Sequence, residues 1–289
     1  MVEIVSDSGY FGQLTKKWGR SAPRQLYRML KLHRTSFTTI LQNMFAILEE
    51  TGGRFTFPTV AGIAKMKPDL VREITKEGHE VASHGNNHVR YTILSTQARR
   101  KDLLSSLQVF KEIGIEIAGF RAPYDRYTDD MPALLDQTDL VWDGGWGFQA
   151  EHRDKTHFFH ETINGHMSRV TYIPLNIWSD DYMIDRKGMG PDSVTKVLKR
   201  EVTKIALTDG VIMFDLHPIR MGQEKFVGCI KELIEHAYEL GAWCTTPTEA
   251  VKYWNLHRRW KSDCKFCLLL TGDIDNWVFS DYLRRILWQ

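Results

Sequence analysis

The feature that most constrains this sequence is a repeated alternation of short apolar runs with longer amphipathic segments. The apolar runs have the length of buried strands, and the segments between them space their apolar residues as helices do. Strands that alternate with helices pair in parallel, because each crossover returns the chain to the same end of the sheet. Eight such runs lie at 54–61, 79–85, 117–123, 140–145, 170–178, 210–218, 242–247 and 265–275.

Eight parallel strands favour a closed barrel over an open doubly wound sheet, which is the alternative. The sequence therefore predicts an α/β fold, a (β/α) barrel of about seven to eight strands. With 289 residues, of which 43% are hydrophobic, the chain can bury a full core, so we expect a single domain over 1–289. The expected helices cover 36–51, 67–78, 96–114, 192–207, 226–241, 248–254 and 279–288.

Charge and composition exclude several classes of protein. Thirty-eight basic and thirty-six acidic residues leave a net charge of +2, which gives no reason to expect nucleic acid as a partner. No apolar run reaches the roughly 20 residues of a membrane-spanning helix, and the first residues lack a secretory pattern, so we expect a cytoplasmic protein. The basic segment 16–34 is either a solvated helix or a contact with an anionic lipid or lipid-linked sugar. The four cysteines are expected to be reduced.

Many polar residues follow directly on a predicted strand. The carboxyl ends of parallel strands meet at one edge of a barrel, and that edge carries the active site in such folds. We therefore expect these side chains to gather at one end, which we call the barrel mouth. They are His84, His88, Arg121, Asp143, Trp178, Asp180, Asp181, His217, Asp273 and Asp275.

Two pairs among them suggest a metal site. His84 and His88 lie four residues apart, so they could bind one cation, although two surface histidines would show the same spacing. Asp273 and Asp275 lie two residues apart after an apolar strand, so both carboxylates face the same way. Burying two like charges requires a cation or an arginine beside them. Otherwise the segment is a polar turn.

A third pair is Asp215 and His217. A carboxylate beside an imidazole keeps it protonated, which suits a general acid, although the histidine could equally make a structural hydrogen bond. The polar insertion 144–168 holds four further histidines. These could form a second metal site, but we expect substrate contacts from this loop, because long loops in compact domains usually serve function.

Three motifs in this order, GHEVASHGNNH, GFRAPY and FDLHP, resemble the polysaccharide deacetylase family, also called the NodB-homology family or carbohydrate esterase family four. The resemblance covers roughly 36–253 and implies a NodB-type barrel. That family opens with a strand that carries an Asp-Asp or Asp-x-Asp motif, whereas the best match here, TGDID, lies in the last predicted strand. We interpret this as a circular permutation, in which 265–289 supplies the first barrel strand and helix and 254–264 is a bridge. The alternative is that Asp7 supplies the motif.

The resemblance implies a metal cofactor. Asp275, His84 and His88 match the ligand positions and would bind a divalent ion while leaving room for water and substrate. Zn²⁺ suits these ligand types best, with Fe²⁺, Mn²⁺ and Co²⁺ as alternatives.

The resemblance also implies catalytic roles. Asp273 would be the general base, Arg121 would orient it, and His217 would be the general acid. A backbone N–H near Tyr124 would help to hold the oxyanion, and Asp180 or Asp181 would tune the acid, with Asp143 as a competitor for that role. Residues expected at the substrate are Tyr124, Trp178, Asp181 and Asp143.

The predicted function is metal-dependent hydrolysis of an N-acetyl or other acyl group from an amino sugar or glycan precursor, which would be the main partner. One alternative is an amidohydrolase of the same fold that acts on a small cytosolic amide or ureide. Another is a barrel that binds carbohydrate without catalysis. A binding module needs no base beside a metal site, so the full set of acid, base and metal ligands favours an enzyme.

Overall fold

The computed structural model describes residues 36–275. The expected helix at 279–288, the basic segment 16–34 and Asp7 lie outside the described residues. None of the helices within the described range is both long and apolar enough to cross a lipid bilayer.

The sheet consists of parallel strands in the order β7, β4, β3, β2, β1, β10, β8. A bridge between Leu175 and Met213 joins the segment after β7 to β8, so the sheet curls back on itself at that point. β9 pairs with the start of β10, outside this path. The strands are β1 (Thr56–Thr59), β2 (Glu80–Ser83), β3 (Gly119–Phe120), β4 (Trp142–Asp143), β7 (Thr171–Tyr172), β8 (Val211–Asp215), β9 (Ala242–Thr245) and β10 (Phe266–Thr271).

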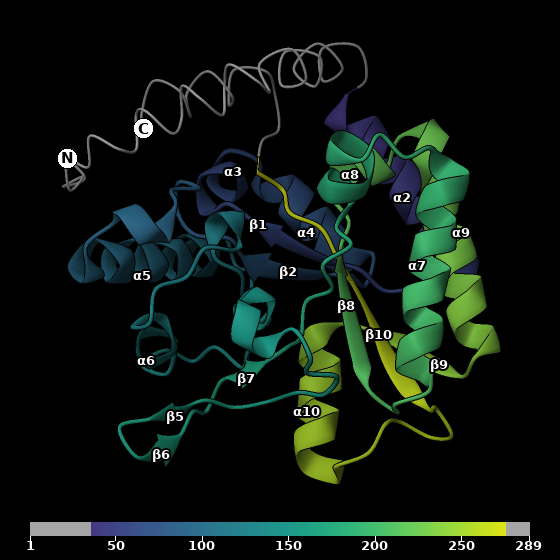
Figure 1. Ribbon diagram of the computed structural model, residues 1–289. Coiled ribbons are helices and arrows are strands. Elements are labelled where there is room, and N and C mark those ends of the chain that lie inside the picture. Colours follow the sequence, from purple (N-terminus) through teal and green to yellow (C-terminus); the bar gives the residue numbers. More distant parts are fainter. Residues whose placement is uncertain (1–35, 276–289) are drawn as a thin grey trace.

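This arrangement confirms the predicted (β/α) barrel. Each of the eight predicted runs contains one of these strands. The last strand within residues 36–275, β10, lies in the middle of the sheet between β1 and β8. In Figure 1, β10 is drawn in yellow directly beside the green β8, although about fifty residues separate them in sequence.

Helices surround the strands, and α2, α7 and α9 pack together on one side (Figure 1). Most begin as their sequences predict: Ser36 and Ser95 accept hydrogen bonds from the first turns of α2 and α5, and α4, α7 and α10 have proline at the start. The helices are α2 (Phe37–Thr51), α3 (Ala61–Met66), α4 (Pro68–Lys76), α5 (Thr96–Glu112), α6 (Met131–Leu135), α7 (Pro191–Ala206), α8 (Pro218–Met221), α9 (Glu224–Glu239) and α10 (Pro247–His257).

The insertion 144–168 has little regular structure. It contains a short hairpin, β5 (Thr162–Ile163) with β6 (His166–Met167), and two single helical turns. The single turns of the molecule are η1 (Tyr91–Ile93), η2 (Pro123–Asp125), η3 (Trp146–Phe148), η4 (Ala150–His152) and the π-helical η5 (Asp181–Arg186). All four cysteines are free thiols, and only Cys264 is not fully buried.

Alternate residues of the central strands face two different cores. In β10, Cys267 and Leu269 pack with residues of the other strands inside the barrel, whereas Leu268 and Leu270 pack outward among helix residues. Side chains two apart on a strand share a face, so the inward set continues towards Asp273. The strand register therefore directs polar residues into the barrel mouth.

Candidate active site

The turn after β2 carries two histidines whose rings lie 4.9 Å apart, His84 and His88. His84 Nδ1 lies 3.0 Å from the carbonyl oxygen of Arg121, which can only accept, so Nδ1 carries the proton. His84 Nε2 is buried and makes no hydrogen bond. His88 has φ of 53°, in the left-handed region. Asp102 holds the turn by accepting from the N–H of Asn86 at 2.9 Å.

The segment after β10 brings two carboxylates to these histidines. Asp275 Oδ1 lies 3.4 Å from His84 Nε2 and 3.2 Å from His88 Nε2. Asp273 Oδ2 lies 3.4 Å from the same nitrogen of His84. Gly272 permits this approach, because a Cβ there would lie 2.2 Å from the carbonyl oxygen of Leu216 at the end of β8.

Arg121 is fully buried and connects the carboxylates of two strands. Its Nη1 donates to Asp215 Oδ1 and to Asp273 Oδ1, both at 3.0 Å, and its Nη2 donates to Thr271 Oγ1 at 2.6 Å. A buried guanidinium that bonds two carboxylates fixes both and offsets their mutual repulsion. One oxygen of Asp273 is therefore engaged, and the other, Oδ2, faces the histidines.

His217, after β8, approaches the same oxygen of Asp273 as His84 does. Its Nε2 is 3.9 Å from Asp273 Oδ2, and its Nδ1 is 2.8 Å from Asp180 Oδ1 and 3.6 Å from Asp215 Oδ2. Burial alone would lower the pKa of His217, but the carboxylates of Asp215 and Asp180 raise that pKa well above its ordinary value of 6.5. The imidazole is therefore protonated at neutral pH.

The other residues expected at the substrate occupy varied positions. The ring of Tyr124 packs on His88 with centroids 4.5 Å apart. Trp178 is half-buried and packs edge-to-face on Tyr182, 5.4 Å away. Asp181 accepts from Ser179 Oγ at 2.6 Å, so it is the neighbouring Asp180 that contacts His217.

Asp143 has a different environment from the one expected. It is fully buried, and its carboxylate accepts from the Tyr127 hydroxyl at 2.7 Å and from the N–H groups of Gly145 and Trp146. Burial raises its pKa to about 6 in spite of these hydrogen bonds. Its bonds organise the start of the insertion, and Asp180 has the contact with His217 for which Asp143 was a candidate.

The sequence analysis missed three polar residues of the site. Thr271 lies two residues before Asp273, so the same strand periodicity could have found it. Arg220, three residues after His217 on α8, donates to Asp180 Oδ2 at 3.3 Å and to Asp185 Oδ2 at 2.8 Å.

The third missed residue is Asp125, which directly follows the GFRAPY motif. Its Oδ1 lies 3.8 Å from Arg121 Nε and is buried without a hydrogen bond. Burial raises the pKa of Asp125 to about 6, while Arg121 opposes the shift. Its φ is 49°, and such backbone strain often marks functional loops.

The donor set of His84, His88 and Asp275 fits a divalent metal. One ligand atom from each residue lies within 4.8 Å of the others. The buried, unbonded Nε2 of His84 is the kind of atom that a metal would satisfy, and its Nδ1–H···O=C bond fixes the ring as in metal-binding histidines. Two imidazoles and one carboxylate are ligand types of zinc and of non-haem iron.

The family model of the polysaccharide deacetylases matches residues 29–141, which include the turn with both histidines and Arg121. The matched segment has the pattern of a polysaccharide deacetylase domain. The match confirms the resemblance predicted from the motifs. None of the curated proteins matches the chain in sequence.

Solved structures show this fold in other proteins. A protein of Mycobacterium smegmatis described as a polysaccharide deacetylase is 19% identical, with a TM-score of 0.65 over 77% of this chain and 79% of that one. One of Pseudomonas aeruginosa PAO1 is 15% identical, with a TM-score of 0.65 over 77% and 74%. Puue Allantoinase is 17% identical, with a TM-score of 0.69 over 82% and 78%. At these identities the likeness establishes the fold alone.

Proposed function

We propose that the deacetylase domain is a metal-dependent hydrolase that removes an N-acetyl or other acyl group from an amino sugar or glycan precursor. The observation that carries this proposal is the position of Asp273 Oδ2, 3.4 Å from His84 Nε2 and 3.9 Å from His217 Nε2. A base thus lies between a set of metal ligands and a protonated histidine, which is what amide hydrolysis requires.

His84, His88 and Asp275 would hold the metal, with Zn²⁺ as the first choice and Fe²⁺, Mn²⁺ or Co²⁺ as alternatives. When bound, the ion supplies a water of lowered pKa and polarises the substrate carbonyl.

Asp273 accepts the proton of the attacking water at Oδ2. Arg121 orients the carboxylate by donating to Oδ1 at 3.0 Å. Because Thr271 and Asp215 hold Arg121 in turn, the base has little freedom to rotate.

His217 donates its Nε2 proton to the departing nitrogen. Asp180 binds Nδ1 and stabilises the imidazolium, and Arg220 holds Asp180. We assign to Asp180 the tuning role that the sequence left open. Tyr124, beside His88, is proposed to contribute its N–H to the oxyanion, and Trp178 and Asp181 remain proposed substrate contacts.

Acetate release from N-acetylated sugars, with metal content measured on the same sample, tests this function. We expect acetate release that stops with a chelator and returns when Zn²⁺ or another divalent ion is added. Lack of acetate release by metal-loaded protein from monomeric, oligomeric and lipid-linked N-acetyl sugars would overturn the proposal.

A second candidate is hydrolysis of a small amide or ureide, which the similarity to an allantoinase favours. The same base and acid would serve a ring amide. Turnover of allantoin without acetate release from any N-acetyl sugar would select this alternative.

The order of strands supports a circular permutation relative to the family. β10 lies between β1 and β8, where it delivers Asp273 and Asp275. In this proposal one domain spans 1–289, 36–253 corresponds to the main family region, and 254–264 bridges to the transplanted strand.

A further inference from the structure

A groove of about 370 Å³ lies at the end of the barrel opposite to the mouth. Its lining residue Lys265 directly precedes β10, whereas Asp273 follows that strand. Eight residues of extended chain separate the two, a distance of about 26 Å. The groove volume is at the lower end of the range of small-molecule sites.

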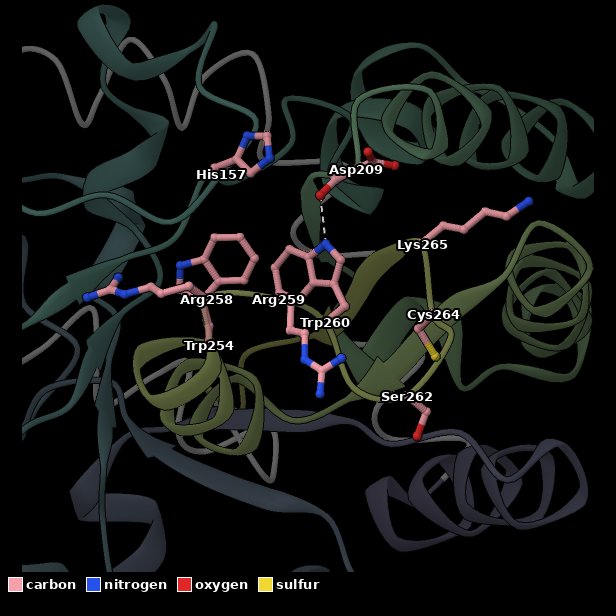
Figure 2. Close-up of a pocket in the computed structure, with 9 residues that line it drawn as sticks. All are labelled: His157, Asp209, Trp254, Arg258, Arg259, Trp260, Ser262, Cys264 and Lys265. Carbon is pink, nitrogen blue, oxygen red and sulfur yellow. Dashed lines mark hydrogen bonds between the residues drawn. The ribbon is translucent and has the colours of Figure 1, made fainter.

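The centre of the groove is aromatic. The indoles of Trp254 and Trp260 lie next to each other, with centroids 4.4 Å apart, and His157 lies beside them (Figure 2). Trp260 is buried and its Nε1 donates to the carbonyl oxygen of Asp209 at 2.6 Å, which fixes the pair in place. Trp254 is partly exposed and also contacts the rings of His157 and Phe158.

The rim of the groove is basic. Figure 2 shows the side chains of Arg258, Arg259 and Lys265 around the indole pair, pointing outwards in different directions. Among the ion pairs of residues 36–275, none includes these three exposed cations, although the nearby Lys261 pairs with Glu249. Against one lining carboxylate, Asp209, the three cations leave an excess of positive charge.

The groove is built from the turns between regular elements. Asp209, Arg258 and Ser262 all line it, and their φ angles are 51°, 54° and 52°. Arg258 is the left-handed C-cap of α10, and Asp209 and Ser262 lie in turns, so the cationic rim is carried by chain reversals next to the indole pair.

We propose that this groove binds an acidic saccharide chain, with a sugar ring on Trp254 and its carboxylate or phosphate groups on the arginines and Lys265. The flat apolar face of a pyranose suits an indole, and guanidinium groups bind carboxylate and phosphate oxygens. Asp209 and Ser262 offer acceptors for sugar hydroxyls. Cations spread around an aromatic centre fit an extended chain with several charges better than one small anion. The choice of a glycan rests on the proposed function, because a deacetylase of polymers gains from a second contact with the same chain.

The test is calorimetric titration of the full chain with a galacturonate hexamer, which is acidic but has no N-acetyl group. We expect binding that weakens with added salt, and weaker or no binding of the neutral maltohexaose. The double variant Arg258→Asn, Arg259→Asn should weaken hexamer binding about tenfold or more, since a hydrogen bond to a charged group contributes on the order of one tenfold step. Asparagine tolerates the left-handed backbone at 258.

Two further variants make the result decisive. Arg100→Asn, Lys101→Asn removes an equally adjacent and exposed basic pair on α5, and it should leave hexamer binding unchanged. Asp275→Ala, which disables the proposed metal site, should also bind the hexamer normally, so that failure of the groove and failure of catalysis are distinguishable.

Several results would overturn the proposal. The hexamer could fail to bind, or both saccharides could bind equally well: either result contradicts the groove as an acidic-saccharide site. An equal loss of hexamer affinity in the two basic-pair variants would also contradict it. Loss of hexamer binding in Asp275→Ala would show that the hexamer binds at the barrel mouth. Binding to anionic phosphatidylglycerol vesicles without binding to the hexamer would assign the groove to a lipid surface instead.

Discussion

Two regions of the molecule are rich in histidine, and they have opposite characters. The barrel mouth has three, His84, His88 and His217, and all three contact carboxylates of the segment after β10. The insertion 144–168 has four within fifteen residues. Each of these lies beside a different neighbour, and within residues 36–275 the groups of possible metal ligands lie only at the mouth.

The contacts in the insertion are local and structural. His160 Nδ1 lies 2.9 Å from the carbonyl oxygen of Ser168, and His152 Nε2 lies 3.2 Å from Glu161. These positions do not support a second metal site in the insertion, which the sequence leaves open as an alternative. Position at the end of a parallel strand is therefore a better guide to chemistry than the density of histidines along the sequence.

The largest expected effect is loss of the metal from the mouth. Asp275→Ala should reduce bound metal to background and abolish turnover, because it removes the one carboxylate of the ligand set. Metal content by plasma emission spectrometry checks this. Asp7→Ala is the control and should retain metal; the reverse pattern would show that Asp7 supplies the motif.

The second largest effect on turnover is expected from removal of the general base with the metal site intact. Asp273→Asn should keep normal metal content and lose about 10²–10⁴-fold in turnover, since the amide cannot accept the proton. Initial rates at saturating substrate measure the loss. A wild-type rate would reject Asp273 as the base.

His217 should have an effect that depends on the leaving group. His217→Asn should slow acetamides with poor amine leaving groups much more than activated acetate esters, which need little protonation. In the wild type, the raised pKa of His217 means that activity persists above pH 6.5 and falls only as the imidazolium loses its proton. Equal losses on amides and esters would place His217 outside proton transfer.

His152 in the insertion should affect stability rather than catalysis. Burial lowers its pKa, and Glu161 and Glu151 offset this only in part. A histidine whose pKa is lower in the folded state than in the unfolded state, where it is about 6.5, contributes stability at pH values above 6.5. This contribution is lost as the pH falls. Between pH 7 and pH 5, the free energy of unfolding should therefore decrease less for His152→Phe than for the wild type. Urea denaturation at each pH measures this free energy. A steeper loss in the variant would contradict the assignment.

The smallest effect is expected at His166. Its ring is exposed and pairs with Asp136 at 3.2 Å, an arrangement that contributes on the order of 0.5 kcal/mol or less. His166→Ala should keep metal content and turnover. A drop in either would mean that the insertion takes part in the site.

The strands could be predicted because their apolar runs are bounded by turn residues, and residues at strand ends follow from the same pattern. The run before TGDID predicted both β10 and the inward direction of Asp273. Short elements such as α3 and α8 were missed, since four to six residues carry too little periodicity.

Partner choice within the site could not be predicted. Asp180 and Asp181 are neighbours in sequence, and the start of the π-helical turn η5 decides that Asp180 faces His217. Likewise, the burial of Asp143 depends on how the insertion folds over it. Such contacts depend on three-dimensional packing between distant segments, which local patterns do not encode.

The central place of β10 has a consequence for synthesis. A ribosome releases β1 and β8 long before residues 266–271, so a growing chain exposes two unpaired strand edges where β10 later inserts. Such edges can pair with other chains, and pairing between distant segments is slow to form. Both edges are therefore paired within the protein only after β10 has been made. The same strand carries Asp273 and Asp275, so sheet completion and assembly of the active site are a single late event.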